Sequence, residues 1–154
     1  MCSSDLNLPD VGRSSGIKRD CQRTLGAALH MVNERELLTG AYRDFNARNL
    51  DAVLDRLAPS VKWANGLEGG HIHGRDAVRE YWTKQWAVLD PHVEPKRIEL
   101  DKSNRWVVTV HQVVKDLKGN QILDTIVYHV CCISDGLIER MDIAHEDPLH
   151  GGNA

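Results

Sequence analysis

Hydrophobic and polar residues alternate through the last third of the chain, between Trp106 and Asp147. A period of two residues is typical of β-strands, because successive side chains of a strand point to opposite faces of its sheet. Two glycine-containing segments, LKGN at 117–120 and SDGL at 134–137, separate three such runs and favour tight turns. The pattern predicts an antiparallel meander of three strands.

The first turn sets the expected pairing of the first two strands. If residues 117–119 form a three-residue loop with Gly119 in the left-handed region, Asp116 lies opposite Asn120. One face of the pair is then expected to carry Val107, Thr109, His111, Val113, Leu123, Thr125, Val127 and His129. The other is expected to carry Val108, Val110, Gln112, Val114, Ile122, Asp124, Ile126 and Tyr128.

The second turn, Asp135-Gly136, is of the two-residue kind that right-twisted hairpins favour. It is expected to set His129 opposite Asp142, with Arg140 on the same largely apolar face. Buried charges need partners or a function, so this cluster indicates either a proton-transfer site or a structural network that holds the strands together. Both interpretations stay open at this point.

Helical periodicity precedes the meander, with apolar residues every three or four positions in three segments and Pro91 after the third. We expect helices over 33–48, from the N-cap Asn49 to about residue 57, and over 75–89. A strand is expected over 61–65, a glycine-rich loop over 66–74, and an edge strand over 92–101. This order of elements predicts an α+β fold.

The length of 154 residues suffices for one domain whose core needs no metal or disulfide. Residues 1–30 show no sustained period and are expected to form a flexible leader. Residues 31–147 are expected to form the domain, and the polar residues 148–154 a flexible tail.

The charge and the cysteines of the chain indicate which binding partners and which cellular location to expect. The charged fraction of 27% and the formal net charge of -3 are ordinary, so we expect neither a nucleic-acid partner nor an acidic membrane surface. The chain shows no apolar run of about eighteen residues and no hydrophobic signal region. Four cysteines lack a framework spacing, and Cys131 and Cys132 are expected to be small core residues. A cytoplasmic location is therefore expected.

His71 and His73 form a His-x-His pattern, which can contribute to a metal site. No third ligand stands nearby, since Glu80 follows within the predicted third helix, so we expect no metal. The chain also lacks a phosphate-binding glycine loop, a nucleophile elbow and a Cys-x-x-Cys pair. We expect no cofactor, which leaves cofactor-independent chemistry or simple binding.

The segments FNARNLDAVLDRLAPSVKW, HGRDAV and DGLI, in this order of elements, resemble the nuclear transport factor 2-like superfamily, in particular its SnoaL-like and ketosteroid-isomerase-like branch. The resemblance covers about residues 33–147. It implies a curved antiparallel or mixed sheet wrapped around the three N-terminal helices. It also implies a cone-shaped pocket open at one end, and often a homodimer built through the other face of the sheet.

The resemblance assigns chemistry position by position. The ketosteroid isomerase base falls at Asn65, its oxyanion-hole tyrosine near Ala41 and its oxyanion-hole acid near His129, and none of these residue types is kept. Tyr42 is the candidate substitute for the tyrosine. The last-strand aspartate of limonene epoxide hydrolase resembles Asp142, and SnoaL-like cyclases use an aspartate as acid and base, a role open to His129 or Asp142.

We therefore expect a pocket that binds a small apolar or amphipathic molecule and transfers protons. The expected catalytic residues are His129, Asp142, which would orient the imidazole, and Asn65, which would hold a carbonyl or a water. The expected substrate-binding residues are Trp63, Tyr81, Trp82, Trp86, His111 and Arg140. The competing hypothesis is a ligand-binding or accessory protein without chemistry.

The second face of the meander predicts a homodimer, because three helices cover only one side of a sheet and a large apolar patch needs cover. The patch is expected to contain Trp106, Val108, Val110, Val114, Ile122, Ile126, Tyr128, Val130, Met141 and Ile143. A leader folded over this face is the alternative.

Overall fold

The structure is a computed structural model that describes residues 27–66 and 68–150. This part contains the helices α1 (Ala27–Asn46), α2 (Leu50–Asp55) and α3 (Arg75–Val88), and the strands β1 (Leu57–Ala64), β2 (His71–His73), β3 (Leu89–Leu100), β4 (Trp106–Asp116), β5 (Gln121–Ser134) and β6 (Leu137–Ala144). The strands form one sheet in the order β2-β1-β6-β5-β4-β3. β1 and β6 run parallel and the other neighbours antiparallel. The expected α+β fold with a mixed sheet is confirmed.

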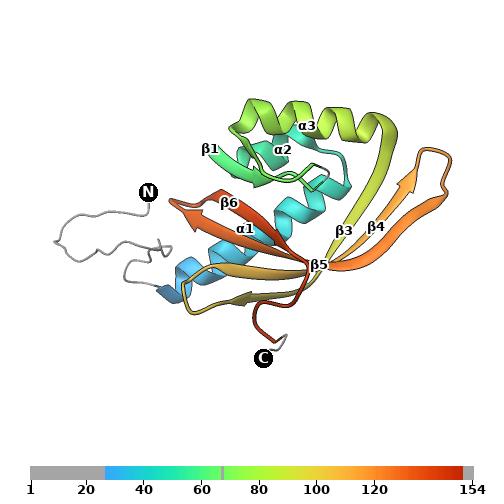
Figure 1. Cartoon of the computed structure of the whole chain (residues 1–154). Helices are drawn as coiled ribbons and strands as arrows, with labels where there is room; N and C mark the ends of the chain where they lie inside the picture. Colours follow the sequence, from blue (N-terminus) through green and yellow to red (C-terminus); the bar gives the residue numbers. More distant parts are fainter. Residues whose placement is uncertain (1–26, 67, 151–154) are drawn as a thin grey trace.

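The helices lie against one face of a strongly twisted sheet, which we call the inner face, and the β4–β5 hairpin extends beyond them (Figure 1). The hydrophobic core fills the space between the helices and this face. Its most deeply buried side chains include Leu38, Val53, Leu57, Val78, Trp82, Trp106, Val108, Val110, Ile133, Ile138 and Met141. One buried hydrogen bond ties α1 to β4, because Trp106 Nε1 donates to Glu34 Oε1 at 2.8 Å.

Most predicted elements are present, with shifted ends. α1 begins at Ala27, before the predicted start and inside the expected leader, whose residues 1–26 lie outside the described part. Asn49 caps α2, where its Oδ1 accepts from the Ala52 N–H at 3.4 Å. The edge position of β3 is confirmed. The prediction of a loop at His71–His73 is wrong, because these residues form β2 and pair with Lys62–Ala64.

The two predicted turns of the meander are present. Asp116 N–H donates to Asn120 O at 2.9 Å, and Gly119 has a φ of 93°. Asp135 and Gly136 both have positive φ, as a two-residue hairpin turn of this twist requires. The local turn chemistry was therefore predictable.

A β-bulge after each turn overturns the predicted register. Between β4 and β5, Lys115 pairs with Gln121 but Val114 pairs with Leu123, so Ile122 is an additional residue. Between β5 and β6, Ile133 pairs with Ile138 but Cys132 pairs with Arg140, so an additional residue enters β6 there. A bulge places two residues of one strand opposite one residue of its partner, and a shift by one residue exchanges the faces of all later side chains.

The faces of the sheet therefore differ from the prediction. The inner face carries Val108, Val110, Gln112 and Val114 together with Leu123, Thr125, Val127 and His129. The outer face of the same two strands carries Thr109, His111, Val113, Asp124, Ile126, Tyr128 and Val130. The expected dimer patch is thus wrong in composition, since Trp106, Val108, Val110, Val114 and Met141 belong to the buried interior.

The two cysteines of β5 differ in their surroundings. Cys131 is buried in the core, as expected, whereas Cys132 is half-buried on the other face of β5 and disulfide-bonded. The cysteines therefore give no support to a cytoplasmic location, which stays a prediction. His150, within the expected tail, lies 3.2 Å from Glu99 Oε1, and residues 151–154 are outside the described part. Among the described helices, none has the length and apolarity to span a membrane.

The register predicts a difference between two identical substitutions on β4. Val108→Thr places a hydroxyl group in the fully buried interior and should lower the free energy of unfolding by about 1–3 kcal/mol. Val113→Thr places the same group on the half-exposed outer face and should change it by less than about 0.5 kcal/mol. Urea denaturation of both variants measures the difference, and equal losses would contradict this register.

Candidate functional site

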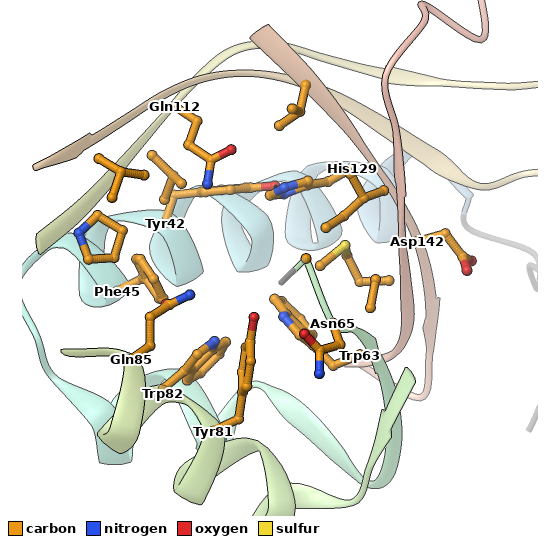
Figure 2. A pocket seen from close by; sticks show the side chains of 18 of the residues that line it. Tyr42, Phe45, Trp63, Asn65, Tyr81, Trp82, Gln85, Gln112, His129 and Asp142 are labelled. Atoms are coloured by element: carbon orange, nitrogen blue, oxygen red, sulfur yellow. The ribbon is translucent and has the colours of Figure 1, made fainter. Parts of the chain in front are cut away.

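A cavity of about 760 Å³ lies between α1, α3 and the inner face of the sheet (Figure 2). Its wall on the helix side is aromatic, with Phe45 from α1 and Tyr81 and Trp82 from α3. Trp63 of β1 meets Trp82 edge to face at a ring separation of 5.2 Å, and Phe45 meets Trp82 in the same way at 5.3 Å. The wall offers large apolar faces in a fixed arrangement.

The expected placement of Trp63, Tyr81 and Trp82 in the pocket agrees with this geometry. Trp86 does not line the cavity but lies behind the wall, stacked on Trp82 at 6.1 Å. The Arg48 guanidinium covers the Trp86 ring at 5.1 Å. The side chain that we expected to bind substrate thus supports the wall from outside.

A buried pair of polar side chains faces the cavity where α1 meets β5. Tyr42 Oη and His129 Nδ1 are 2.8 Å apart, and the planes of the two rings are nearly parallel, with an interplanar angle of 16°. Tyr42 is 8% and His129 9% exposed, and both side chains line the cavity. Figure 2 shows the two side chains meeting end to end.

Burial keeps both members of this pair uncharged. It lowers the pKa of His129 from its ordinary value to about 4. Burial, followed by the nearby Cys131 thiol, raises the pKa of the Tyr42 phenol well above 10. A buried hydroxyl proton without an acceptor is costly, and His129 Nδ1 is the acceptor within reach of Tyr42. The favoured arrangement has Tyr42 donating to Nδ1, which leaves the proton of the imidazole on Nε2.

The predicted pairing of His129 with Asp142 is wrong. The bulge sets His129 opposite Ile143 and Asp142 opposite Val130, so the two side chains belong to different faces of the sheet. In Figure 2 the Asp142 carboxylate points away from the aromatic side chains of the cavity.

Asp142 instead pairs with Arg140 and with His71. Its Oδ2 accepts from Arg140 Nε at 2.8 Å, and its Oδ1 lies 2.7 Å from His71 Nε2. Partial burial alone would raise the pKa of Asp142, but the hydrogen bonds from Arg140 and His71 outweigh it and leave the pKa below the usual value. The structure therefore contains a His71-Asp142-Arg140 network in place of the expected network with His129.

Two further expected residues are located elsewhere. His111 lies on the outer face, where its Nε2 is 2.7 Å from Asp124 Oδ1, and Arg140 is half exposed beside Asp142. Asn65 does line the cavity, but its Oδ1 accepts from the Glu68 N–H at 3.0 Å and so holds the turn of the glycine-rich loop. Neither His111 nor Arg140 is part of the cavity wall.

Sequence reasoning did not place Gln85 and Gln112 in the site, and it considered Tyr42 only as a substitute. Gln112 is a polar residue in an otherwise valine-rich run, which is the one signal that the sequence offers for it. Both glutamine side chains point into the cavity in Figure 2. Across the residues that the structure describes, no three histidine, cysteine or acidic side chains come together as metal ligands.

Comparisons with known proteins agree with this architecture. The model of the SnoaL-like domain family matches residues 38–141, whereas no curated protein matches the chain. An NTF2-like protein of unknown function from Burkholderia pseudomallei K96243 has a similar structure, with a TM-score of 0.65 and 23% identity over 74% of this chain and 91% of that one.

Two other similar structures carry functional names. TerC, co-crystallised with polyporic acid, has a TM-score of 0.64 and 23% identity over 74% of this chain and 92% of that one. SalBIII, an epoxide hydrolase/cyclase-like enzyme of pyran ring formation in salinomycin, has a TM-score of 0.64 and 16% identity over 74% of this chain and 91% of that one. At these identities the likeness shows the fold, which is that of NTF2-like proteins.

The lowered pKa of His129 predicts a pH-dependent stability. The unfolded chain binds a proton at this residue near pH 6.5, whereas the folded chain does so only near pH 4. The contribution of His129 to the free energy of unfolding is therefore fully present above pH 6.5. It is lost as the pH falls from 6.5 to 4, by on the order of 3 kcal/mol.

Urea denaturation between pH 7.5 and 4 measures this change. His129→Gln removes the titrating group and should flatten the profile in this window, whereas His92→Gln, at an exposed position of β3, should leave it unchanged. An equally steep profile in His129→Gln would contradict the assignment.

Proposed function

We propose that this chain, which belongs to the SnoaL-like domain family, binds a small, mainly apolar molecule in its cavity and acts on it by cofactor-independent acid-base chemistry at His129. The Tyr42–His129 pair carries the proposal. One imidazole nitrogen is occupied by Tyr42, and the other, Nε2, has no hydrogen-bond partner among the described residues. A buried side chain on a cavity wall with one unused donor is suited to a ligand.

A neutral imidazole with its proton on Nε2 donates a hydrogen bond to a ligand oxygen. Donation to a carbonyl group stabilises the enolate oxygen that forms when a neighbouring C–H group gives its proton to a base from solvent, such as hydroxide or buffer. The carbon takes a proton back from water to restore the ketone, and the surrounding apolar wall strengthens the hydrogen bond to the enolate. Tyr42 acts as a positioning residue, because it holds the ring and selects the tautomer. This role replaces the general-base role with Asp142 that the sequence predicted.

The remaining lining fits a ring-containing ligand. Trp63, Trp82 and Phe45 offer apolar faces, while Gln85 and Gln112 offer uncharged hydrogen-bonding groups. The similar structure of TerC was crystallised with polyporic acid, and SalBIII is named an epoxide hydrolase/cyclase-like enzyme. These names support small-molecule binding and chemistry of the cyclase or hydrolase type for this cavity.

The competing function is ligand binding without chemistry. It is favoured by the same hydrogen bond, because Tyr42 and His129 satisfy one another in the interior and such a pair also stabilises a fold. The two functions differ in whether the cavity accelerates proton transfer.

The proposed catalytic function is tested by hydrogen–deuterium exchange of 2-tetralone, a bicyclic ketone with acidic C–H groups. The protein in D₂O should accelerate deuterium incorporation next to the carbonyl, measured by NMR. His129→Leu removes the donor and should reduce the accelerated rate by about 100-fold. His129→Gln keeps an N–H donor and should recover part of that loss.

Tyr42→Phe tests whether Tyr42 positions the His129 ring or instead contributes to the binding of 2-tetralone. It should lower the exchange rate at saturating 2-tetralone but leave the half-saturating concentration unchanged. Binding of 2-tetralone without any acceleration of exchange would favour the non-catalytic function. Circular dichroism of each variant checks that the fold is retained.

We also propose a homodimer through the outer face of the sheet, with the composition that the corrected register gives. The helices cover the inner face, whereas Ile126 is 42% exposed on the other side, where it lies opposite His111 and beside Thr109, Val113, Asp124 and Tyr128. A stable interface needs about 800 Å² from each partner, and a second copy of this sheet face offers a matching surface.

The dimer is tested by light scattering on the full chain. Ile126→Arg should convert the dimer to a folded monomer, because it places an additional, unpaired charge in the proposed interface. Leu117→Arg, at the exposed tip of the β4–β5 hairpin, is the matched control and should remain dimeric. A wild-type chain that is monomeric at micromolar concentration would refute the proposal.

A further inference from the structure

The distribution of charge around the cavity indicates which ligands it accepts. No lysine, arginine or glutamate belongs to the cavity lining among the described residues, and Asp142 is its one carboxylate. That carboxylate forms an ion pair with Arg140, whose Nε lies 2.8 Å from Oδ2, and its Oδ1 lies 2.7 Å from His71 Nε2. It points away from the aromatic wall in Figure 2.

The histidines of the lining do not supply a positive charge to the interior either. His129 is buried and neutral at neutral pH, since burial lowers its pKa to about 4. His71 is engaged by Asp142, and His145 is exposed to water beyond the end of β6. An anion inside the cavity would therefore lose its hydration without gaining a counter-charge, which is unfavourable.

A cation meets a similar obstacle. The aromatic rings of Trp63, Trp82 and Phe45 attract cations, but among the described lining residues no unpaired carboxylate faces the interior to replace lost hydration. Charge of either sign is thus disfavoured in the space between the helices and the sheet.

Uncharged polar groups are well supplied there. The side chains of Gln85 on α3 and Gln112 on β4 point into the cavity, and neither has a hydrogen-bond partner among the described residues. Each amide offers a donor and an acceptor, and His129 Nε2–H offers a further donor. A ligand with carbonyl, hydroxyl or amide groups satisfies these atoms without bringing a charge.

We propose that the cavity selects uncharged ligands, with an apolar ring-containing body and one or more neutral hydrogen-bonding groups that contact Gln85 and Gln112. The inference rests on the proposed binding function and specifies its ligand class. It separates this site from one that recognises carboxylates or phosphates.

Three probes of one shape test the charge preference. They are 2,6-naphthalenedicarboxamide, which is neutral, 2,6-naphthalenedicarboxylate, which is a dianion, and 2,6-bis(aminomethyl)naphthalene, which is a dication. Substitution at both ends means that one polar group enters the cavity in either orientation. Calorimetric titration of the full chain at pH 7 should show binding of the diamide, with the two charged probes at least tenfold weaker.

The outcomes separate the two proposals. A dicarboxylate or a diammonium probe that binds as tightly as the diamide overturns the charge preference and leaves small-molecule binding intact. Failure of all three probes to bind overturns both proposals.

Substitution of a single lining residue gives a second test. Gln112→Lys places a cation in the cavity and should strengthen dicarboxylate binding at least tenfold, whereas Gln112→Met, of similar length and without charge, should not. Gln85→Lys provides the same test from α3 if Gln112→Lys fails to fold, as judged by circular dichroism. No gain of dicarboxylate affinity in a folded lysine variant would contradict the proposal.

Discussion

The two β-bulges that flank β5 control the relation between this sheet and its cavity. Each adds one residue to one strand of a pair, so that side chains beyond it change faces relative to their neighbours. With this register, Val108 and Val110 enter the core and Gln112 and His129 face the helices. Without the bulge between β5 and β6, Asp142 would lie opposite His129, and its charged side chain would share the inner face with the imidazole.

The inward position of His129 has electrostatic consequences. A histidine surrounded by the core keeps its neutral form, because burial removes the hydration that the imidazolium needs. Tyr42, from a helix distant in the sequence, then provides the hydrogen bond that a buried imidazole nitrogen requires. The result is an uncharged hydrogen-bonding group at a cavity wall, rather than the charged His-Asp pair that the hairpin spacing predicted.

The same separation of faces organises the rest of the site. Ion pairs such as Arg140–Asp142 and the contact of His111 with Asp124 lie on partly exposed surfaces, where water supports the charges. The cavity keeps aromatic rings and neutral amides. Trp86 and Arg48 stabilise the aromatic wall from behind, so that its geometry depends on side chains that do not line the cavity.

Local chemistry was readable from the sequence by itself. The spacing of apolar residues predicted the second and third helices, Asn49 predicted a cap, and Gly119 and Asp135-Gly136 predicted the two turns, because each of these signals acts over a few neighbouring residues. The motifs between residues 33 and 147 also indicated the family and its α+β cone. Trp63, Tyr81 and Trp82 line the cavity, as expected of an aromatic pocket wall, whereas Trp86 does not, and their role in binding a substrate stays a prediction.

The register of the strands and the hydrogen-bond partners of the site residues were decided by the tertiary structure alone. A bulge gains its stability from the packing of a whole strand against the helices, so turn sequences do not reveal it. The pairing of Tyr42 with His129 joins positions 87 residues apart, and that of His71 with Asp142 joins positions 71 apart. Sequence patterns identified an imidazole, a carboxylate and a guanidinium near one end of the meander. Only the fold determined which imidazole meets the carboxylate and which one is buried beside a phenol.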